Sequence, residues 1–345
     1  MFRIPLLTVI VAGLALPAGA ATVSITCGSV GAEQTLCREA VKDWEAATGH
    51  EVQVVAPPTS TSDQLALYQQ MLNSGSGDID IFQIDVVWPG ILGSHFVDLR
   101  PYFEPEDIDA HFDGIIAGLS RGDALLAMPW FTDAPMLYYR TDLLDKYGLP
   151  VPETWEQMTA AATTIQQGER AAGNSRFWGF VWQGKAYEGL TCDALEWVNS
   201  RGGGLIVEAD GTVSINNPAA ARAIDLAASW VGTISPPGVL NYQEEDSRGV
   251  FQTGNAAFMR NWPYAYSLGN GPDTAVAGKN GAAPETKGGA DGRHSATLGG
   301  WQHAVSRYSE DPEIAADLVR FLPSHDLQKR RAIEGSFAPT YPALY

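Results

Sequence analysis

Residues 23–55 read VSITCGSVGAEQTLCREAVKDWEAATGHEVQVV, and they predict a strand, a helix and a second strand in succession. Val23–Thr26 and Val52–Val55 are rich in β-branched residues, which favour strands. Between them, Glu33–Thr48 has apolar residues at helical spacing, and Gly49 follows as a stop signal. The apolar residues of this helix are Leu36, Ala40, Val41, Trp44 and Ala47. Because a strand–helix–strand unit closes by a right-handed crossover, the two strands are expected to be parallel and the fold class α/β.

The same alternation continues along the chain in two groups. A helix expected over Ser62–Ser74 precedes a short apolar strand at Ile79–Ile84. A second group begins with strands after Leu125 and contains a helix that opens with the capping box Thr154–Gln157. Strand character returns at Ala296–Val305. The sequence therefore predicts two α/β units, with a late segment that could return to the first.

Residues 1–20 have the pattern of a secretory signal peptide. Arg3 is a short basic region, Leu6–Leu16 is an apolar core, and Ala18-Gly19-Ala20 is a small-residue cleavage site, so cleavage is expected before Ala21. The apolar core is short for an uncleaved membrane anchor, which is the alternative interpretation, and no later stretch reaches ~18 apolar residues. We therefore expect an exported, soluble, periplasmic protein.

Composition narrows the function classes. The chain has 345 residues, of which 45% are hydrophobic, and this excludes a disordered or fibrous protein. Lys and Arg number 22 against 40 Asp and Glu, which gives a net charge of −18. An acidic surface repels phosphate backbones, so nucleic acid is not expected as a partner.

The three cysteines and six histidines do not predict a metal site. Cys27 and Cys37 are close enough in the expected strand and helix for a local disulfide, and two reduced core thiols are the alternative. Cys192, on an apolar helix, is expected to be buried and free. The histidines show no HExxH or other ligand pattern, and the chain has neither GxGxxG nor a P-loop lysine. We expect no metal and no cofactor.

Carboxylates, glycine turns and aromatic rings recur where strands meet loops. In open parallel sheets, ligands bind beyond the carboxyl ends of strands. Carboxylates accept strong hydrogen bonds from sugar hydroxyls, and aromatic rings cover the apolar faces of a sugar. Taken singly, each tryptophan could belong to the core and each aspartate could be a helix cap or a solvated loop residue. The carbohydrate hypothesis depends on their occurring together, in residues 28–33, 85–90, 130–133, 262–266 and 298–301.

Several of these stretches resemble family 1 extracellular solute-binding proteins of bacterial ABC transporters. Within that family they are similar to the trehalose/maltose (α-glucoside) branch, and the segment around Asp85 is the most specific to it. The resemblance covers nearly the whole chain after residue 20. It is carried by Gly49–Val55, Gly77–Pro89, Pro129–Arg140, Trp155–Gln157, Gly254–Trp262 and Gly299–Trp301.

The resemblance implies a periplasmic-binding-protein-like fold of two α/β lobes, with several crossovers and a ligand cleft between the lobes. Residues 21–131 and 276–324 would form the N-terminal lobe, and residues 132–275 and 325–345 the C-terminal lobe. Sugar would be trapped by hinge closure. Relatives usually continue past a Pro-Thr-Tyr-Pro-like segment with helices that brace the second lobe and can reach the ligand, whereas this sequence ends at Tyr345. Two alternatives follow: the C-terminal lobe is a truncated form, or those contacts are missing.

Site residues are carried over position by position. Glu33, Asp85 and Asp133 would accept hydrogen bonds from hydroxyl groups. Phe131 would stand where relatives often carry a tyrosine, and Gln64 would face the cleft from a helix. The stacking platforms and the glycines that offer backbone contacts would be Trp262, Trp301, Gly299 and Gly300.

The expected function is reversible capture of a disaccharide or α-glucoside of the trehalose, maltose or sucrose class, without catalysis. A monomer would deliver this ligand to the transmembrane permease subunits of an ABC importer. One alternative is a secreted glycoside hydrolase that uses two of Glu33, Asp85 and Asp133 as its catalytic pair. Another is a binding protein for a non-sugar solute such as a polyamine, since an acidic and aromatic cleft also suits a cation.

Overall fold

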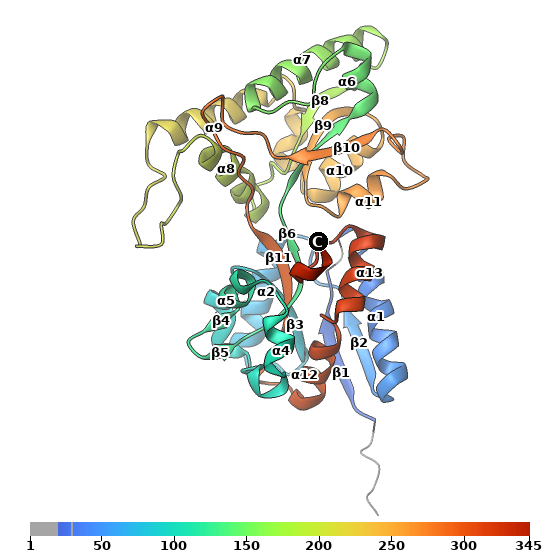
Figure 1. Cartoon of the computed structure of the whole chain (residues 1–345), viewed down its shortest axis with the longest axis vertical. Coiled ribbons are helices and arrows are strands. Elements are labelled where there is room, and N and C mark those ends of the chain that lie inside the picture. The colour runs from blue at the N-terminus through green and yellow to red at the C-terminus, as the bar shows by residue number, and fades with distance from the viewer. Residues whose placement is uncertain (1–19, 29) are drawn as a thin grey trace, which may run out of the picture.

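The computed structural model describes residues 20–28 and 30–345. All but the last residue of the expected signal peptide, residues 1–20, therefore lies outside the described residues. Within the described part, no helix is long and apolar enough to cross a membrane. Figure 1 shows two lobes, one above the other along the long axis of the molecule, each with helices packed around its own sheet.

The first lobe contains a five-stranded sheet in the order β2-β1-β3-β11-β6. Its strands are β1 (Thr22–Thr26), β2 (Glu51–Val55), β3 (Ile81–Asp85), β6 (Met128–Asp133) and β11 (Gly299–Val305). Strand β1 is parallel to both β2 and β3, as the alternation predicted, whereas β11 runs antiparallel between β3 and β6. The return of β11 from the other lobe inserts a distant segment into this sheet, between β3 and the edge strand β6.

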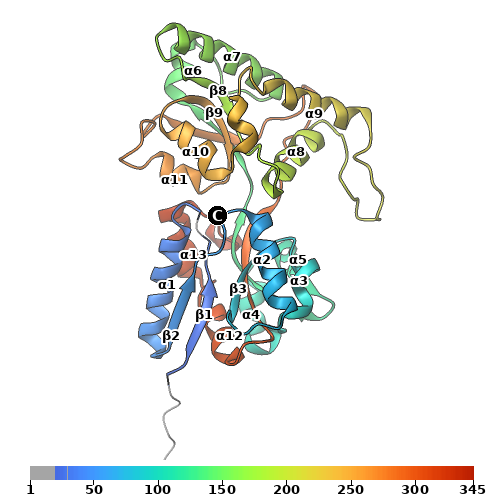
Figure 2. The ribbon, with the colours of Figure 1, turned by 180° about the vertical axis from the view of Figure 1, so that it is seen from behind.

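Helices cover both faces of the first sheet (Figures 1 and 2). Helix α1 ends where Gly49 adopts a left-handed conformation with φ of 78°, which glycine reaches without strain. The helices of this lobe are α1 (Glu33–Thr48), α2 (Thr61–Asn73), α3 (Pro89–Leu92), α4 (Pro105–Asp109), α5 (Asp113–Gly118), α12 (Pro312–Phe321) and α13 (His325–Gly335), with the short strands β4 (Ser120–Arg121) and β5 (Ala124–Leu125). Cys27 and Cys37 are joined by a disulfide between the end of β1 and α1, and Cys192 is buried and free.

The second lobe is built on a four-stranded sheet in the order β10-β7-β9-β8. Its strands are β7 (Met136–Arg140), β8 (Trp178–Val181), β9 (Ala256–Asn261) and β10 (Asn280–Pro284). Its helices are α6 (Thr141–Tyr147), α7 (Trp155–Ala171), α8 (Glu188–Ser200), α9 (Pro218–Trp230), α10 (Glu244–Gln252) and α11 (Ala265–Gly269). Trp155, Phe180 and Trp230 pack together at the centre of this lobe's core.

The structure places two segments in the other lobe from the one that the sequence predicted. Residues 276–284 were assigned to the first lobe, but β10 pairs with β7 in the second sheet. Residues 325–345 were assigned to the second lobe, but α13 packs on α1, and its Arg331 donates to the main-chain oxygen of Trp130 at 2.7 Å. Both predictions are wrong for the same reason. Strand pairing and helix packing between distant segments leave no local periodic signal in the sequence.

The chain passes between the lobes at two places in the described residues. The first runs from β6 to β7, and the second from β10 back to β11. Figure 2 shows that these crossings lie beside each other, with α2 of the first lobe facing α8 of the second. The ends of several strands are thereby gathered at the junction of the lobes.

Candidate functional site

A cleft of about 1120 Å³, part of it open to solvent, lies between the two lobes. Side chains from both sheets and from both crossings line it. All nine of the site residues expected from the sequence are among its lining residues: Glu33, Gln64, Asp85, Phe131, Asp133, Trp262, Gly299, Gly300 and Trp301. The structure thus brings together residues that are up to 268 positions apart in the chain, from Glu33 to Trp301.

Three neighbouring strands of the first lobe present their ends at one edge of the cleft. Trp301 on β11 pairs with Asp85 on β3 and with Phe131 on β6, and Gly299 pairs with Asp133. Gly300 has a φ of 131°, and a Cβ there would lie 2.6 Å from the main-chain oxygen of Phe131. The glycine is therefore required for the strands to meet closely at this edge.

Glu33 is the first residue of α1 and lies at the floor of the cleft. Its side chain is buried and accepts a hydrogen bond from Nε2 of Gln83 on β3. Burial is the main cause that raises the pKa of Glu33 to about 7, and the Gln83 hydrogen bond opposes it. Gly28 lies so close that a side chain there would collide with the Glu33 carboxylate.

Asp85 and Asp133 are the other two buried carboxyl groups of the first lobe's edge. Burial raises the pKa of Asp85 to about 7, and repulsion from Glu188 adds to the shift. Burial also raises the pKa of Asp133 well above its ordinary value, followed by repulsion from Glu33. Oδ1 of Asp133 accepts no hydrogen bond from any described residue. The first lobe's edge of the cleft therefore carries three buried carboxyl groups, one of which has an oxygen without a donor among the described residues.

Gln64 and Phe131 occupy less exposed positions in the wall. Nε2 of Gln64 donates to the Tyr68 hydroxyl at 2.9 Å, so this amide is already engaged within the lobe. The Phe131 ring packs against Phe337, with 4.6 Å between ring centroids.

Trp262 and Trp301 are only half-buried, unlike the buried Trp88 that packs edge-on against Trp301. Trp88 is therefore a core residue, which was the alternative interpretation of each of these tryptophans.

The second lobe contributes acidic residues that the sequence analysis did not single out. Glu188 and Cys192 on α8 and Glu244 on α10 line the cleft, together with Tyr264. The Cys192 thiol donates to Glu188 at 2.7 Å, and Trp262 Nε1 lies 3.5 Å from the Glu244 carboxylate. Glu188 follows β8 and opens the next helix, so the strand-end rule that found Asp85 could have found it too.

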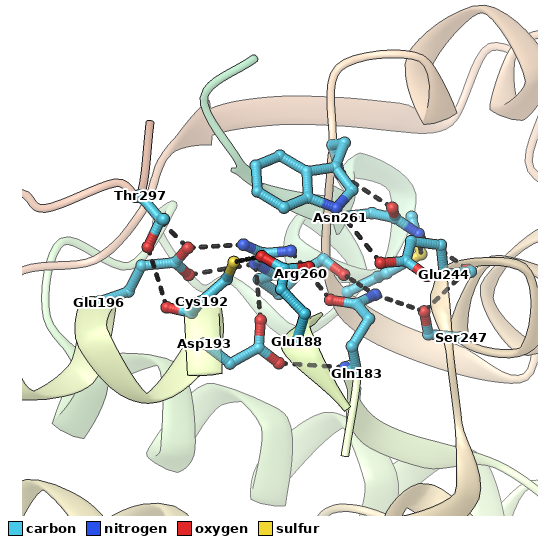
Figure 3. A network of polar contacts seen from close by, with 12 residues as sticks. Gln183, Glu188, Cys192, Asp193, Glu196, Glu244, Ser247, Arg260, Asn261 and Thr297 are labelled. Carbon is cyan, nitrogen blue, oxygen red and sulfur yellow. Dashed lines mark hydrogen bonds and ion pairs between the residues drawn. The ribbon is translucent and has the colours of Figure 1, made fainter. Parts of the chain in front are cut away.

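A buried ionic network lies behind this wall (Figure 3). The Arg260 guanidinium contacts Glu196 at 2.5 Å and Asp193 at 2.9 Å. It also lies 4.2 Å from the centre of the Trp262 ring. Gln183 extends the network by donating to Ser247 at 2.7 Å. These contacts fix the position of Trp262, one of the two half-buried rings of the cleft.

Helices α2 and α8 connect the two lobes across the mouth of the cleft. The Thr61 hydroxyl donates to the Glu188 carboxylate at 3.1 Å, and the Glu188 amide donates to the Ser62 hydroxyl at 3.2 Å. These two hydrogen bonds hold the lobes together, and the cleft lies between the lobes.

Comparison with known proteins gives consistent results over nearly the whole chain. The family model of the bacterial extracellular solute-binding protein matches residues 31–329. A protein of Deinococcus radiodurans described as a probable ABC transporter-binding protein is 48% identical over 329 residues, which cover 95% of this chain and 78% of that protein.

Solved structures agree with the architecture. The maltose-bound MalE3 of T. maritima is 37% identical, with a TM-score of 0.88, and the match covers 94% of this chain and 83% of that one. A solute-binding protein of Agrobacterium vitis with bound D-mannitol is 22% identical, with a TM-score of 0.81 and coverage of 94% and 79%. At that lower identity the likeness concerns the fold alone.

Proposed function

The chain belongs to the bacterial extracellular solute-binding protein family and is a solute-binding component of an ABC transporter, and from this premise we propose that its ligand is a disaccharide or α-glucoside of the trehalose, maltose or sucrose class. The observation that carries the proposal is the convergence of Glu33, Asp85 and Asp133 with Trp262 and Trp301 in one cleft. Such a set can accept hydrogen bonds from hydroxyl groups and cover the apolar faces of sugar rings.

The mechanism that this geometry supports is capture by closure of the lobes. Asp85 and Trp301 lie on the first lobe, whereas Trp262 and Glu244 come from the second, so a ligand that touches both sets gains contacts only when the lobes approach. A ligand shifts an open–closed equilibrium by its better contacts with the closed state. The crossings at residues 133–136 and 285–298 would then bend as the hinge.

The setting of this binding event is part of the same proposal. A monomer would work in the periplasm after export and deliver its ligand to the transmembrane permease subunits of the importer. The maltose-bound T. maritima structure supports the ligand class, because that chain is 37% identical over nearly all of this one.

Ligand titration with product analysis tests the proposal. The chain without residues 1–20 should show a thermal shift and calorimetric binding with at least one of trehalose, maltose and sucrose, and the recovered sugar should be intact. Release of free glucose with time would contradict the proposal and favour a glycoside hydrolase that uses the same carboxyl groups. Absence of binding to all three would contradict the ligand class.

A further inference from the structure

The charges around the cleft are strongly unbalanced. Five carboxyl side chains line it: Glu33, Asp85, Asp133, Glu188 and Glu244. Among the described residues that line it, none is a lysine, arginine or histidine. A neutral saccharide needs acceptors and donors in comparable number, because each of its hydroxyl groups is both donor and acceptor. Once ionised, these five carboxyl groups offer acceptors only.

The cations behind the wall do not restore the balance. Arg260 is already paired with Asp193 and Glu196, and the buried Glu285 close by adds a further acid to that group. Burial and then repulsion from Glu196 raise the pKa of Glu285 well above its ordinary value.

Arg331, on α13 of the first lobe, is the buried cation beneath the floor of the cleft. It stacks on Trp130 at 3.5 Å and donates to the main-chain oxygens of Leu322 and Trp130. Its attraction for Glu33 is the smallest of the effects on that carboxyl group. Neither arginine therefore forms an ion pair with a carboxyl group that lines the cleft.

Among the carboxyl groups that line the cleft, one buried oxygen has no hydrogen-bond donor in the described residues. Asp133 is 8% exposed, and its Oδ1 accepts no hydrogen bond from a described residue. Repulsion from Glu33 acts on its charge, followed by an opposing attraction from Arg260 and then by repulsion from Asp85. A buried acceptor in this state is costly unless a donor, and above all a charged donor, reaches it.

Building on the proposed saccharide ligand, we infer that the cleft selects a saccharide that carries an ammonium group over the same saccharide with a hydroxyl in that place. The ammonium group would donate to Oδ1 of Asp133, which has no donor among the described residues, and would also be attracted by Asp85. Its sugar rings would contact the half-buried rings of Trp262 and Trp301, as a neutral saccharide would. An anionic saccharide is disfavoured, because the cleft offers five carboxyl groups and, among the described lining residues, no lysine, arginine or histidine.

Calorimetric titration with matched ligands tests the inference. Trehalose and maltose are compared, at pH 6.5 and 0.15 M salt, with the same disaccharides in which one hydroxyl is replaced by an amino group, and with spermidine as an ammonium ligand without sugar rings. The aminated disaccharide should bind about tenfold or more tightly than its parent. Binding should also release protons from the cleft carboxyls, which makes the measured enthalpy depend on the buffer.

Variants locate the effect. Asp133→Asn and, separately, Asp85→Asn keep the shape of the side chain and should each reduce the preference for the aminated ligand to about threefold or less. Asp109→Asn removes an exposed carboxylate of α4, outside the cleft, and should keep the full preference.

The outcomes separate the inference from the proposed function. Equal or tighter binding of the parent disaccharides would overturn the inference and leave the saccharide proposal standing. Binding of spermidine with no disaccharide of either kind would overturn both. Retention of the preference in Asp133→Asn and Asp85→Asn would overturn the assignment to these two carboxyls.

Discussion

Trp301 lies directly opposite Asp85 on the neighbouring antiparallel strand, so the half-buried indole and the buried carboxyl group share one edge of the cleft. Strand β11 reaches this position only after the chain has returned from the second lobe. The pair therefore joins a residue that precedes the second lobe in the chain to one that follows it, and it combines a hydrogen-bond acceptor with an apolar platform, the two kinds of contact that a sugar requires.

The first prediction concerns Trp301. Replacement by alanine should weaken binding of the disaccharide about thirtyfold, because a stacking platform of this size contributes about 2 kcal/mol to binding. The folded protein should lose little stability, since the ring is only half-buried. Calorimetric titration and thermal melting of the unliganded protein measure the two effects.

Tyr266→Ala is the matched control, because this ring is 45% exposed on α11 and does not line the cleft. It should bind as the parent does. A Trp301→Ala variant with unchanged affinity would remove Trp301 from the proposed site.

How much of this arrangement could be predicted from the sequence depends on the range of the interactions. The parallel strands β1, β2 and β3 and the helices between them follow from local periodicity, and so do Glu33 and Asp85 at their ends. The sequence does not predict that β10 pairs with β7 or that α13 packs on α1, because these contacts join distant segments with no local pattern.

The two glutamates that the second lobe contributes to the cleft were not predicted, for a related reason. Glu188 and Glu244 lie at the starts of α8 and α10, where a carboxylate is ordinarily explained by the helix dipole. The folded arrangement shows that both side chains line the cleft, and of the two only Glu188 could have been found by its place after a strand. Arg260 was likewise not predicted as the centre of a buried network, because an arginine inside a strand is uninformative until its partners are known.

The second prediction concerns the contact between α2 and α8. The double change Thr61→Val and Ser62→Ala removes both hydroxyl groups that bind Glu188. The unliganded protein should open further, and ligand affinity should fall about three- to tenfold, since two modest hydrogen bonds are lost from the closed state. Small-angle scattering measures the radius of gyration, and titration measures the affinity.

Thr164→Val controls for the loss of a hydroxyl group, because Thr164 is exposed on α7 and donates only within its own helix. It should change neither quantity. An unchanged radius together with unchanged affinity in the double variant would mean that this contact does not influence closure.

The third prediction concerns pH. Burial and then repulsion from Glu188 raise the pKa of Asp85 from 3.8 to about 7 in the folded protein. Between these pH values the folded chain keeps a proton that the unfolded chain has released, so this contribution to stability is full below pH 3.8 and is lost as the pH rises through about 7. Asp85→Asn stays neutral and should therefore become more stable than the parent, on the order of 2–4 kcal/mol, as the pH rises from 4 to 8.

Denaturant unfolding of the unliganded proteins at several pH values measures this difference. Taking the difference between variant and parent cancels the opposite contribution of His111 and His303, whose pKa values are lowered by burial. Asp109→Asn, which removes an exposed carboxyl group of α4 outside the cleft, is measured alongside as the matched substitution. A flat difference for Asp85→Asn would show that Asp85 is ionised in the unliganded cleft.

The last prediction concerns Arg260. Behind the part of the cleft wall that the second lobe forms, its guanidinium is the one described cationic group that contacts two buried acids, Asp193 and Glu196. Replacement by leucine removes the charge and keeps an apolar side chain, so Asp193 and Glu196 remain buried without a partner. The free energy of unfolding should fall by about 3–5 kcal/mol. Trp262 should also lose its fixed position, because the guanidinium lies 4.2 Å from its ring.

A compensating variant separates lost charge pairing from lost packing. Adding Asp193→Asn and Glu196→Gln to Arg260→Leu removes the unpaired charges and should recover a substantial part of the stability, as measured by urea unfolding. Arg121→Leu, an exposed arginine of β4, should have little effect. If the triple variant were no more stable than Arg260→Leu alone, the stabilisation would come from packing around the guanidinium, and the ionic network would not be the reason that Trp262 keeps its position at the cleft.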